Sequence, residues 1–264
     1  MIVAGCDIGS LTAKAVILNN GEVVSTAVSK VCPKPEDSAK MIMNLALQNT
    51  DLTMENLDYS VGTGYGKDQI SFFNRTESEI SCHGKGAWMS DNSVRTIVDI
   101  GGQDAKSIKL DEQGNVTRFM YNDKCASGTG RFIEIMAEAL ELDLAEISSI
   151  GQQSKKELRL SNQCVVFAET EVISLINEGY ELPDIINGLN FALASRVAAL
   201  AKSIIVEENV LMTGGVAKNR GVFKMLEQAL GVSFLTNKLD PQINGALGAA
   251  YYAEEALQQS TFSQ

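Results

Sequence analysis

A twelve-residue phrase whose residue types could bind phosphate occurs twice in the chain, 92 residues apart. Residues 7–18 read DIGSLTAKAVIL and residues 99–110 read DIGGQDAKSIKL, and six of the twelve positions are identical. Each copy combines a carboxylate, a glycine turn and a lysine. Glycine at the tip of a hairpin lets backbone N–H groups approach phosphate oxygens, because no Cβ stands in the way. The duplication therefore predicts two matched loops that grip a phosphate chain.

The roles of the individual side chains follow from their chemistry. Hydroxyl groups and a lysine can donate to phosphate, whereas the carboxylates of Asp7 and Asp99 only accept. These two carboxylates suit Mg²⁺ or its water shell, because Mg²⁺ prefers oxygen ligands and keeps several waters. A third element, Thr213-Gly214-Gly215, follows a strand-like run and opens a predicted helix, which suits a nucleotide base or ribose. The predicted nucleotide contacts are Gly9, Ser10, Leu11, Thr12, Lys14, Gly101, Gly102, Gln103, Gly214, Gly215 and Lys218.

Two of the five cysteines, Cys125 and Cys164, each precede a predicted helix. A helix N-terminus carries partial positive charge and unpaired N–H groups, which lower the pKa of a thiol placed there. Two thiolates are too few for a four-cysteine cluster site, but a two-fold homodimer would supply four. The alternative is that both are buried structural thiols, since free cysteine is among the most buried residue types.

The elements that must position these residues alternate between strands and helices. Strand-like runs cover residues 1–28, with a turn at Asn19-Asn20-Gly21, and then 94–99, 105–110, 115–121 and 209–212. Helical patterns cover residues 37–50, 83–90, 131–142, 164–178, 184–206, 217–230 and 245–259. The segment Gly62-Thr63-Gly64-Tyr65-Gly66 is a glycine-rich loop without an assigned role. This alternation predicts an α/β fold whose two halves pack around a cleft.

Composition excludes several classes of function. The 264 residues carry a formal net charge of −11, which argues against nucleic acid and anionic membranes as partners. No apolar run approaches the roughly 18 residues of a membrane span, and the N-terminus lacks the pattern of a secretory signal. We therefore expect a cytoplasmic protein whose cysteines are free thiols or metal ligands. His83 is the single histidine, which excludes a histidine-rich metal site.

The two phosphate loops, the Gly-Gly element and the terminal segment GALGAA at 245–250 together resemble the actin, Hsp70 and sugar-kinase superfamily. In that superfamily, two similar ribonuclease H-like halves close on ATP and Mg²⁺. The resemblance covers essentially the whole chain. It implies a first half over residues 1–92, completed by a C-terminal helix over 245–264, and a second half over 93–244. It also implies that Gln242 lies where a nucleotide contact is expected.

Four segments narrow this resemblance: NDKCASGTGRF, NQCVVFAETEVIS, DIGGQDAK and GTGYG. They are similar to activators (component A) of 2-hydroxyacyl-CoA dehydratases in the BadF/BadG/BcrA/BcrD type of ATPase. They also resemble ATPase subunits of benzoyl-CoA reductase and reductases of double-cubane cluster proteins. The resemblance implies that Cys125 and Cys164 hold one [4Fe–4S] cluster per homodimer. It further implies reduction by a ferredoxin or flavodoxin, ATP-driven delivery of one electron to an iron–sulfur partner enzyme, and an anaerobic cytoplasm.

The second phosphate loop departs from the pattern of kinases. Gln103 follows the two glycines, and a neutral amide cannot act as a general base. Asp104 could orient water, or it could serve a metal or the turn itself. With Asp7 as the metal-holding group, these residues predict slow ATP hydrolysis without a phosphoryl acceptor.

Two other functions remain open on the sequence. A small-molecule kinase of the same fold, acting for example on an amino sugar, would need a carboxylate base at the acceptor. A nucleotide-dependent structural clamp would not need Cys125 or Cys164.

Overall fold

The computed structural model describes residues 1–262, which form two compact units. Unit 1 comprises residues 1–95, 110–117 and the segment from residue 237 onward, and unit 2 comprises residues 96–109 and 118–236. Each unit contains one five-stranded sheet, with strand order β3-β2-β1-β4-β5 in unit 1 and β10-β9-β6-β7-β8 in unit 2. In both sheets the central strand pairs antiparallel with the next strand of the chain and parallel with a later one. The predicted α/β class and internal duplication are confirmed.

Unit 1 begins with three consecutive antiparallel strands. Its strands are β1 (Ile2–Ile8), β2 (Thr12–Asn19), β3 (Glu22–Lys30), β4 (Tyr59–Thr63) and β5 (Arg75–Thr76), and its α-helices are α1 (Pro35–Leu47), α2 (Glu79–Ser90) and α8 (Asn244–Phe262). The turn between β2 and β3 uses Asn20 and Gly21, both with positive φ (48° and 80°). An Asn-Gly pair favours this conformation, which matches the twist of the flanking strands.

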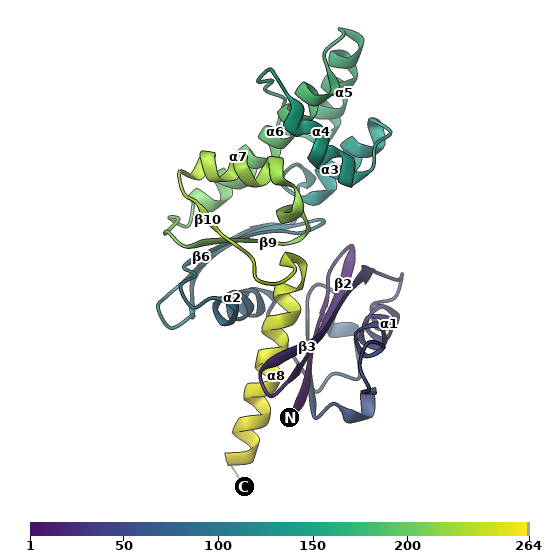
Figure 1. The fold of residues 1–264 in the computed structure, drawn as a ribbon, viewed down its shortest axis with the longest axis vertical. Helices are drawn as coiled ribbons and strands as arrows, with labels where there is room; N and C mark the ends of the chain where they lie inside the picture. Colours follow the sequence, from purple (N-terminus) through teal and green to yellow (C-terminus); the bar gives the residue numbers. More distant parts are fainter. Residues whose placement is uncertain (263–264) are drawn as a thin grey trace. The chain divides into compact units, whose positions relative to one another are not determined.

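Both faces of the unit 1 sheet are covered. On one face, Ala4, Cys6 and Ile8 of β1 pack in a cluster with Ile42 and Met43 of α1. On the other face, Val3, Val16 and Val61 pack against the alanines of α8, and Figure 1 shows α8 running along the strands beside α2. A strand buried on both faces is apolar nearly throughout, which explains the sequence of β1.

Helix α8 lies so close to its neighbours that glycine is required at the contacts. A Cβ on Gly5 of β1 would collide with the backbone of Ala246 and Ala250, and a Cβ on Gly86 of α2 would collide with the backbone oxygen of Asn244. The glycine/alanine-rich segment predicted as a terminal helix therefore packs backbone against backbone. The prediction extended this helix to residue 264, but residues 263–264 lie outside the described part of the chain.

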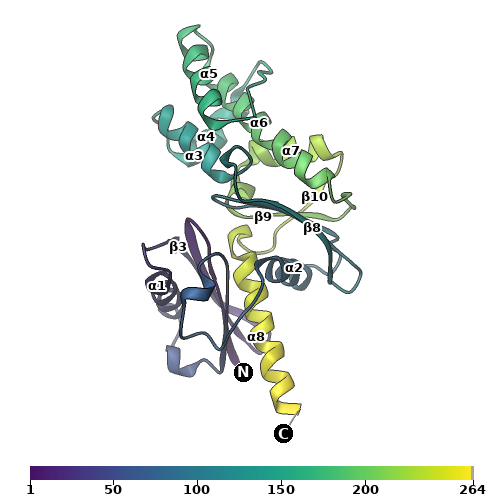
Figure 2. The same cartoon turned by 180° about the vertical axis from the view of Figure 1, so that it is seen from behind.

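Unit 2 places its helices on one side of its sheet (Figures 1 and 2). Its strands are β6 (Thr96–Ile100), β7 (Ala105–Leu110), β8 (Val116–Asn122), β9 (Val210–Thr213) and β10 (Phe234–Leu235), with the ends of β7 and β8 around residues 110–117 counted in unit 1. Its α-helices are α3 (Gly130–Ala139), α4 (Leu144–Ile150), α5 (Val165–Asn177), α6 (Leu182–Lys202) and α7 (Arg220–Leu230). Leu189 and Leu193 of the long helix α6 pack in one core with Val98 and Ile100 of the central strand β6.

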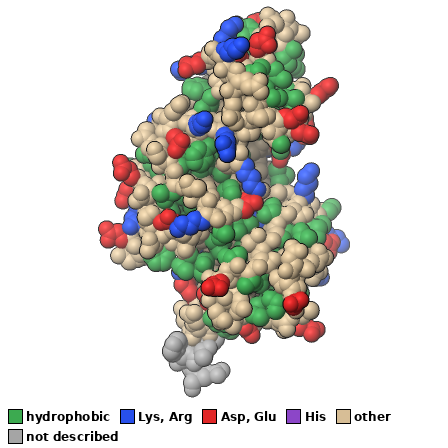
Figure 3. Space-filling model, in the orientation of Figure 1, with side chains coloured by type: hydrophobic (Ala, Val, Ile, Leu, Met, Phe, Trp, Pro, Cys, Tyr) green, Lys and Arg blue, Asp and Glu red, His purple; other side chains and the backbone are tan. Residues whose placement is uncertain are grey.

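The surface carries charges of both signs. Figure 3 shows acidic and basic side chains interspersed over the visible face, with hydrophobic side chains between them. Within the described residues, no helix is both long and apolar enough to cross a membrane.

Candidate functional site

The first repeated phrase forms the hairpin between β1 and β2. The backbone N–H of Gly9 donates to the carbonyl of Thr12 at 3.1 Å and closes the tip. Asp7 lies opposite Lys14 in the strand register, and the lysine Nζ lies 3.2 Å from Asp7 Oδ2. Asp7 is 3% exposed, and its Oδ1 has no hydrogen-bond partner among the described residues. Because an unsatisfied buried carboxylate oxygen is costly, this atom fits a role as a ligand of a cation or of its water shell.

The glycine-rich segment at residues 62–66 was predicted as a loop, but Gly62 and Thr63 form the end of strand β4, and Gly64 lies against the same carboxylate. Gly64 has a φ of 88°, and a Cβ at this position would collide with Asp7 Oδ1. A Cβ on Gly245, at the start of α8, would lie 3.2 Å from Asp7 Oδ2. Glycine at these two positions allows the backbone to approach Asp7 closely. They lie far from Asp7 in sequence, so the pattern of residues around Asp7 alone could not indicate them.

The second phrase repeats this geometry between β6 and β7. The N–H of Gly101 donates to the carbonyl of Asp104 at 2.9 Å, and Asp99 lies opposite Lys106 in the register. Here, however, both carboxylate oxygens have protein partners. Asp99 Oδ1 accepts a hydrogen bond from the Thr213 hydroxyl at 2.7 Å, and Oδ2 lies 3.4 Å from Lys106 Nζ. The fit to Mg²⁺ is therefore better at Asp7 than at Asp99, although both were predicted to hold it.

The residues at the second hairpin tip differ in exposure. Gln103 is exposed, whereas Asp104 is half-buried and forms an ion pair with Lys106. In this structure Asp104 therefore closes the turn through its backbone carbonyl and pairs with Lys106 through its side chain. A role in the turn is one of those that the sequence left open for it. The role of Gln103 and Asp104 in catalysis stays a prediction.

The predicted adenosine loop follows β9. Gly214 has a φ of 84°, and a Cβ there would collide with the backbone of Ile100, so the position requires glycine. Gly215–Lys218 form a 3₁₀ turn, and α7 begins at Arg220 rather than at residue 217. Asn219 caps α7 by accepting hydrogen bonds from two backbone N–H groups at 2.9 and 3.2 Å. This cap fixes the start of α7 at Arg220, three residues later than the helical pattern of the sequence predicts. In unit 1, Gln242 lies in the 3₁₀ turn Pro241–Ile243 that precedes α8.

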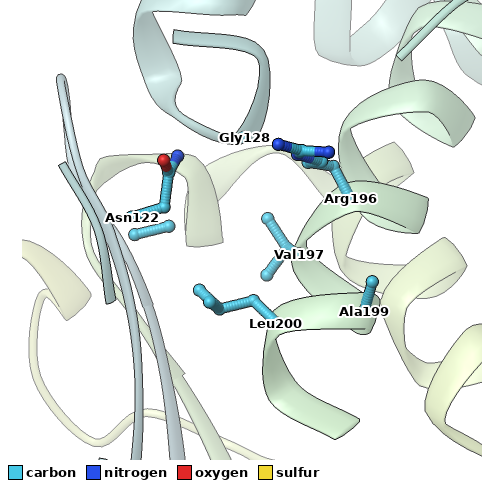
Figure 4. A pocket seen from close by; sticks show the side chains of 7 residues that line it. Asn122, Gly128, Arg196, Val197, Ala199 and Leu200 are labelled. Atoms are coloured by element: carbon cyan, nitrogen blue, oxygen red, sulfur yellow. The ribbon is translucent and has the colours of Figure 1, made fainter. Parts of the chain in front are cut away.

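Cys125 precedes a 3₁₀ turn at Ala126–Gly128 that leads directly into α3. Its thiol is half-buried, and Sγ lies 3.0 Å from the Ser127 hydroxyl. The hydrogen bond from Ser127 lowers the pKa of the Cys125 thiol, and the charge of the Arg196 guanidinium adds to this effect. Figure 4 shows Arg196 reaching from α6 toward the turn at Gly128, with Asn122 across the pocket. The environment of Cys125 therefore favours the thiolate, which is the form that binds iron.

Cys164 occupies the N-cap position of α5, and its carbonyl accepts a hydrogen bond from the N–H of Ala168 at 3.1 Å. Its thiol is half-buried. The loop before it is fixed by the N–H of Ser161, which donates to Glu171 Oε2 at 2.8 Å. Both cysteines thus start helical segments of unit 2, as the sequence predicted.

The other cysteines differ in their fit to a metal site. Cys6 and Cys82 are buried, and burial raises the pKa of Cys6 well above its usual value and that of Cys82 to about 12. Cys32 is half-buried, with Sγ 3.8 Å from the sulfur of Met41. The described residues contain no group of three or more histidine, cysteine or acidic side chains that could hold a metal within one chain. Cys125 and Cys164, the two cysteines that the sequence predicts as cluster ligands, are both half-buried, and their role as ligands stays a prediction.

A direct connection joins the second phosphate loop to the helix after Cys125. The N–H groups of Gly130 and Arg131, at the start of α3, donate to the carbonyls of Gly101 and Gly102 at 2.8 and 2.7 Å. A Cβ on Gly130 would lie 2.9 Å from the Gly101 oxygen. This contact could not be predicted from the sequence, because it joins residues that only the fold of unit 2 brings together.

Two such sheets, each with a glycine hairpin at its centre, are characteristic of the actin-like ATPase fold, and this chain has that fold. The chain belongs to the BadF/BadG/BcrA/BcrD ATPase family, whose model matches residues 4–253. It is 42% identical over 258 residues to the activator of lactoyl-CoA dehydratase from Anaerotignum propionicum, covering 98% of this chain and 99% of the relative. It is also 42% identical over 251 residues to the (R)-2-hydroxyglutaryl-CoA dehydratase activating ATPase from Acidaminococcus fermentans, covering 94% and 95%.

Solved structures support the same assignment. The activator of 2-hydroxyisocaproyl-CoA dehydratase from Clostridium difficile, with bound ADPNP, superposes with a TM-score of 0.95 at 39% identity and covers 100% of this chain and 98% of that one. A ROK-family glucokinase from Streptomyces griseus superposes with a TM-score of 0.55 at 14% identity, covering 97% of this chain and 100% of that one. The kinase shares the fold alone.

Proposed function

We propose that this ATPase is a one-electron donor that activates a 2-hydroxyacyl-CoA dehydratase or a related iron–sulfur enzyme. Two relatives of similar length are named as activators of such dehydratases. A more distant relative is a component of benzoyl-CoA reductase from Thauera aromatica, 30% identical over 261 residues and covering 95% of this chain and 92% of the relative. The two half-buried cysteines at helix starts supply the thiolates that electron transfer through iron requires.

The hairpin tips bind the nucleotide phosphates in this proposal. The N–H groups of Gly9 and Gly101 close their own hairpins, so the donors come from the residues that follow them. In unit 1 these are the groups of Ser10, Leu11 and Thr12, with Asp7 Oδ1 directed to Mg²⁺ or its water shell. Lys14 pairs with the other oxygen of Asp7 and orients this carboxylate. Mg²⁺ would neutralise charge that develops on the phosphates during hydrolysis.

Cys125 and Cys164 from each of two copies hold a shared [4Fe–4S] cluster in this proposal. When bound, such a cluster supplies one-electron redox chemistry at low potential. The hydrogen bond from Ser127 and the charge of Arg196 lower the pKa of the Cys125 thiol, and Cys164 lies at the N-terminus of α5, whose partial positive charge favours an anionic group bound there. A ferredoxin or flavodoxin is the proposed electron source, in an oxygen-free cytoplasm.

The observation that carries the coupling of ATP to electron transfer is the connection from Gly101 and Gly102 to α3. A loop that binds phosphate cannot shift without moving or breaking its hydrogen bonds to Gly130 and Arg131. The same helix start follows Cys125 by a single turn. The state of the nucleotide is thereby transmitted to a cluster ligand, which gives ATP hydrolysis a means of gating the transfer.

Anaerobic purification and reconstitution test the proposal. We expect iron and sulfide at half a cluster per chain, a two-chain assembly, and ATP-dependent activation of a purified dehydratase in the presence of dithionite. The variants Cys125→Ser and Cys164→Ser should lose iron and activation. The variant Cys32→Ser is the matched control, because this half-buried thiol lies in unit 1 and has no proposed role.

A protein that binds no iron after reconstitution would contradict the proposal. ATP turnover that rises with a sugar and needs no reductant would instead support a small-molecule kinase. Activation that survives both cysteine substitutions would support a nucleotide-dependent clamp.

A further inference from the structure

The two cysteines that we propose as cluster ligands have different surroundings. The Ser127 side chain is fully buried, and its hydroxyl lies 3.0 Å from Cys125 Sγ. A thiolate can only accept, so a hydroxyl at this distance donates to the sulfur whenever Cys125 is ionised or bound to iron. Among the described residues, Cys125 is the partner of this hydroxyl.

The position of the Ser127 hydroxyl is fixed by the backbone around it. The side-chain amide of Asn122 donates to the carbonyl of Cys125 at 2.7 Å and accepts from its N–H at 3.3 Å, so it holds the peptide groups on both sides of Cys125. The hydroxyl of Thr129 donates to the carbonyl of Ala126 at 2.9 Å and closes the turn. Thr129 is also fully buried. The contact between Ser127 and Cys125 is thus part of a rigid turn rather than an incidental surface contact.

The matching position after Cys164 cannot make this bond. Ser127 lies two residues after Cys125, and Val166 lies two residues after Cys164. Valine has no donor, and its side chain is 64% exposed. In a symmetric pair of chains, two of the four sulfurs would therefore receive a hydroxyl hydrogen bond and the other two would not.

We propose that Ser127 is a positioning residue that donates a hydrogen bond to the Cys125 sulfur and thereby raises the reduction potential of the cluster. This inference rests on the proposed function. A hydrogen bond to a ligand sulfur withdraws electron density from it and stabilises the more negative, reduced state. The consequence is a donor that is easier to load with an electron, and whose Cys125 and Cys164 ligands differ electronically.

The test compares Ser127→Ala with Thr129→Val in the reconstituted full-length protein. Both variants remove one buried hydroxyl from the same turn, but only the first removes the bond to sulfur. We expect Ser127→Ala to shift the midpoint of an anaerobic redox titration to a more negative potential, by about a fivefold to tenfold change in the reduction equilibrium, where tenfold corresponds to about 59 mV for one electron. Thr129→Val should keep the wild-type midpoint, because the backbone N–H of Thr129 also donates to the Ala126 carbonyl, at 3.0 Å, and keeps the turn closed. Ser127→Thr, which retains a hydroxyl, should restore it.

Iron content and the thermal unfolding midpoint of each variant are also measured, so that failure of the proposed function can be distinguished from failure of the inference about Ser127. A wild-type protein without a cluster overturns the proposed function. A wild-type protein with a cluster, together with Ser127→Ala at an unchanged potential, overturns this inference alone. If Ser127→Ala retains no cluster, Ser127→Gly is titrated in its place. Loss of the cluster in both, with retention in Ser127→Thr, would show that the hydroxyl is needed for assembly and would overturn the claim about the potential.

Discussion

At the scale of single residues, the two halves of the duplication have diverged in what their carboxylates contact. Asp7 keeps one buried oxygen without a protein partner among the described residues, whereas Asp99 is bound by Thr213 and Lys106. The same three-residue signature, Asp-Ile-Gly, therefore marks two different environments. In the proposed function Asp7 serves a cation, whereas Asp99 fixes β9 and its glycine loop to the centre of the unit 2 sheet.

This difference predicts opposite outcomes for two matched substitutions. Asp7→Asn should lower the rate of Mg²⁺-dependent ATP hydrolysis on the order of a hundredfold, because a metal ligand contributes several kcal/mol to the transition state. Its unfolding midpoint should fall less than that of Asp99→Asn, because loss of the ion pair with Lys14 is offset by removal of the charge from a carboxylate with one unsatisfied buried oxygen. Asp99→Asn should lower the unfolding midpoint first, because it weakens a buried hydrogen-bonded pair. Steady-state hydrolysis over a Mg²⁺ titration and thermal unfolding measure the two effects. Equal loss of hydrolysis without loss of stability at both positions would contradict the asymmetry.

At the scale of elements, the sequence was sufficient for the long strands and helices but not for the short ones. The hydrophobic runs and the Asn-Gly turn predicted β1, β2 and β3, and the helical spacing predicted α1 and α5. The five-residue strand β4, the two-residue strands β5 and β10 and the seven-residue helix α4 were missed. Such short segments contain too few residues to establish a pattern, and they form because neighbouring elements supply their hydrogen bonds and packing.

The same limit applied to the site. The glycine hairpins and both cysteines at helix starts could be predicted, because the signals for them are local. The bond between Thr213 and Asp99 joins residues 114 positions apart, and Gly64 reaches Asp7 only through the pairing of β4 with β1. Local spacing contains no information about these partners. Ser127 offered a weak signal, a hydroxyl two residues after a cysteine.

Helix α2 offers a test of the close packing against α8. Gly86→Ala should lower the free energy of unfolding by about 1–3 kcal/mol, because the new Cβ collides with the backbone oxygen of Asn244, which cannot move independently. Gly84→Ala in the same helix is the control. Its new Cβ meets side-chain methyl groups of Val116 and Leu110, which can adjust, and helix propensity gains about 1 kcal/mol. Denaturant unfolding measures both, and equal effects would contradict the packing argument.

A second test at this scale concerns the loop that precedes Cys164. Asp184 at the start of α6 accepts hydrogen bonds through one oxygen from the N–H groups of Lys155 and Lys156 and from the Ser154 hydroxyl, at 2.8, 3.0 and 2.9 Å. The bond from the Lys155 N–H is the main cause that lowers the pKa of Asp184.

Because the folded-state pKa lies below the unfolded value of about 3.9, the stability that Asp184 contributes is present above that value and is lost as the pH falls through the folded pKa. Asp184→Asn should therefore lower the thermal midpoint at neutral pH, and the difference from the wild type should shrink below about pH 4. Thermal unfolding from about pH 3 to pH 7 measures this. A constant difference across the range would contradict it.

At the scale of the whole molecule, both phosphate hairpins and both proposed cluster ligands are intrinsic to one chain, but a complete four-thiolate site is not. The described residues provide two half-buried thiols at helix starts, and in the proposed function a second copy supplies the other two. Cluster binding and association of two chains should consequently be linked, because a group that binds only the associated form stabilises it by mass action.

Removal of the cluster tests this linkage. Treatment of the reconstituted protein with an iron chelator under anaerobic conditions should shift the sedimentation pattern from two chains toward one, and renewed reconstitution should reverse the shift. The variant Cys125→Ser should resemble the chelated protein at every concentration. A two-chain assembly that persists unchanged after complete loss of iron would show that other surfaces hold the copies together.

The short turn between Cys125 and Gly130 has a mechanical consequence. Four residues separate the sulfur ligand from a backbone group that is hydrogen-bonded to Gly101, and three of them are already wound into a 3₁₀ turn. A tether of this length contains almost no slack. A displacement at one end must therefore move the other end and cannot be absorbed by motion of the turn. A longer insertion at this point would uncouple ATP hydrolysis from electron transfer, while the protein would still hydrolyse ATP and still hold its cluster.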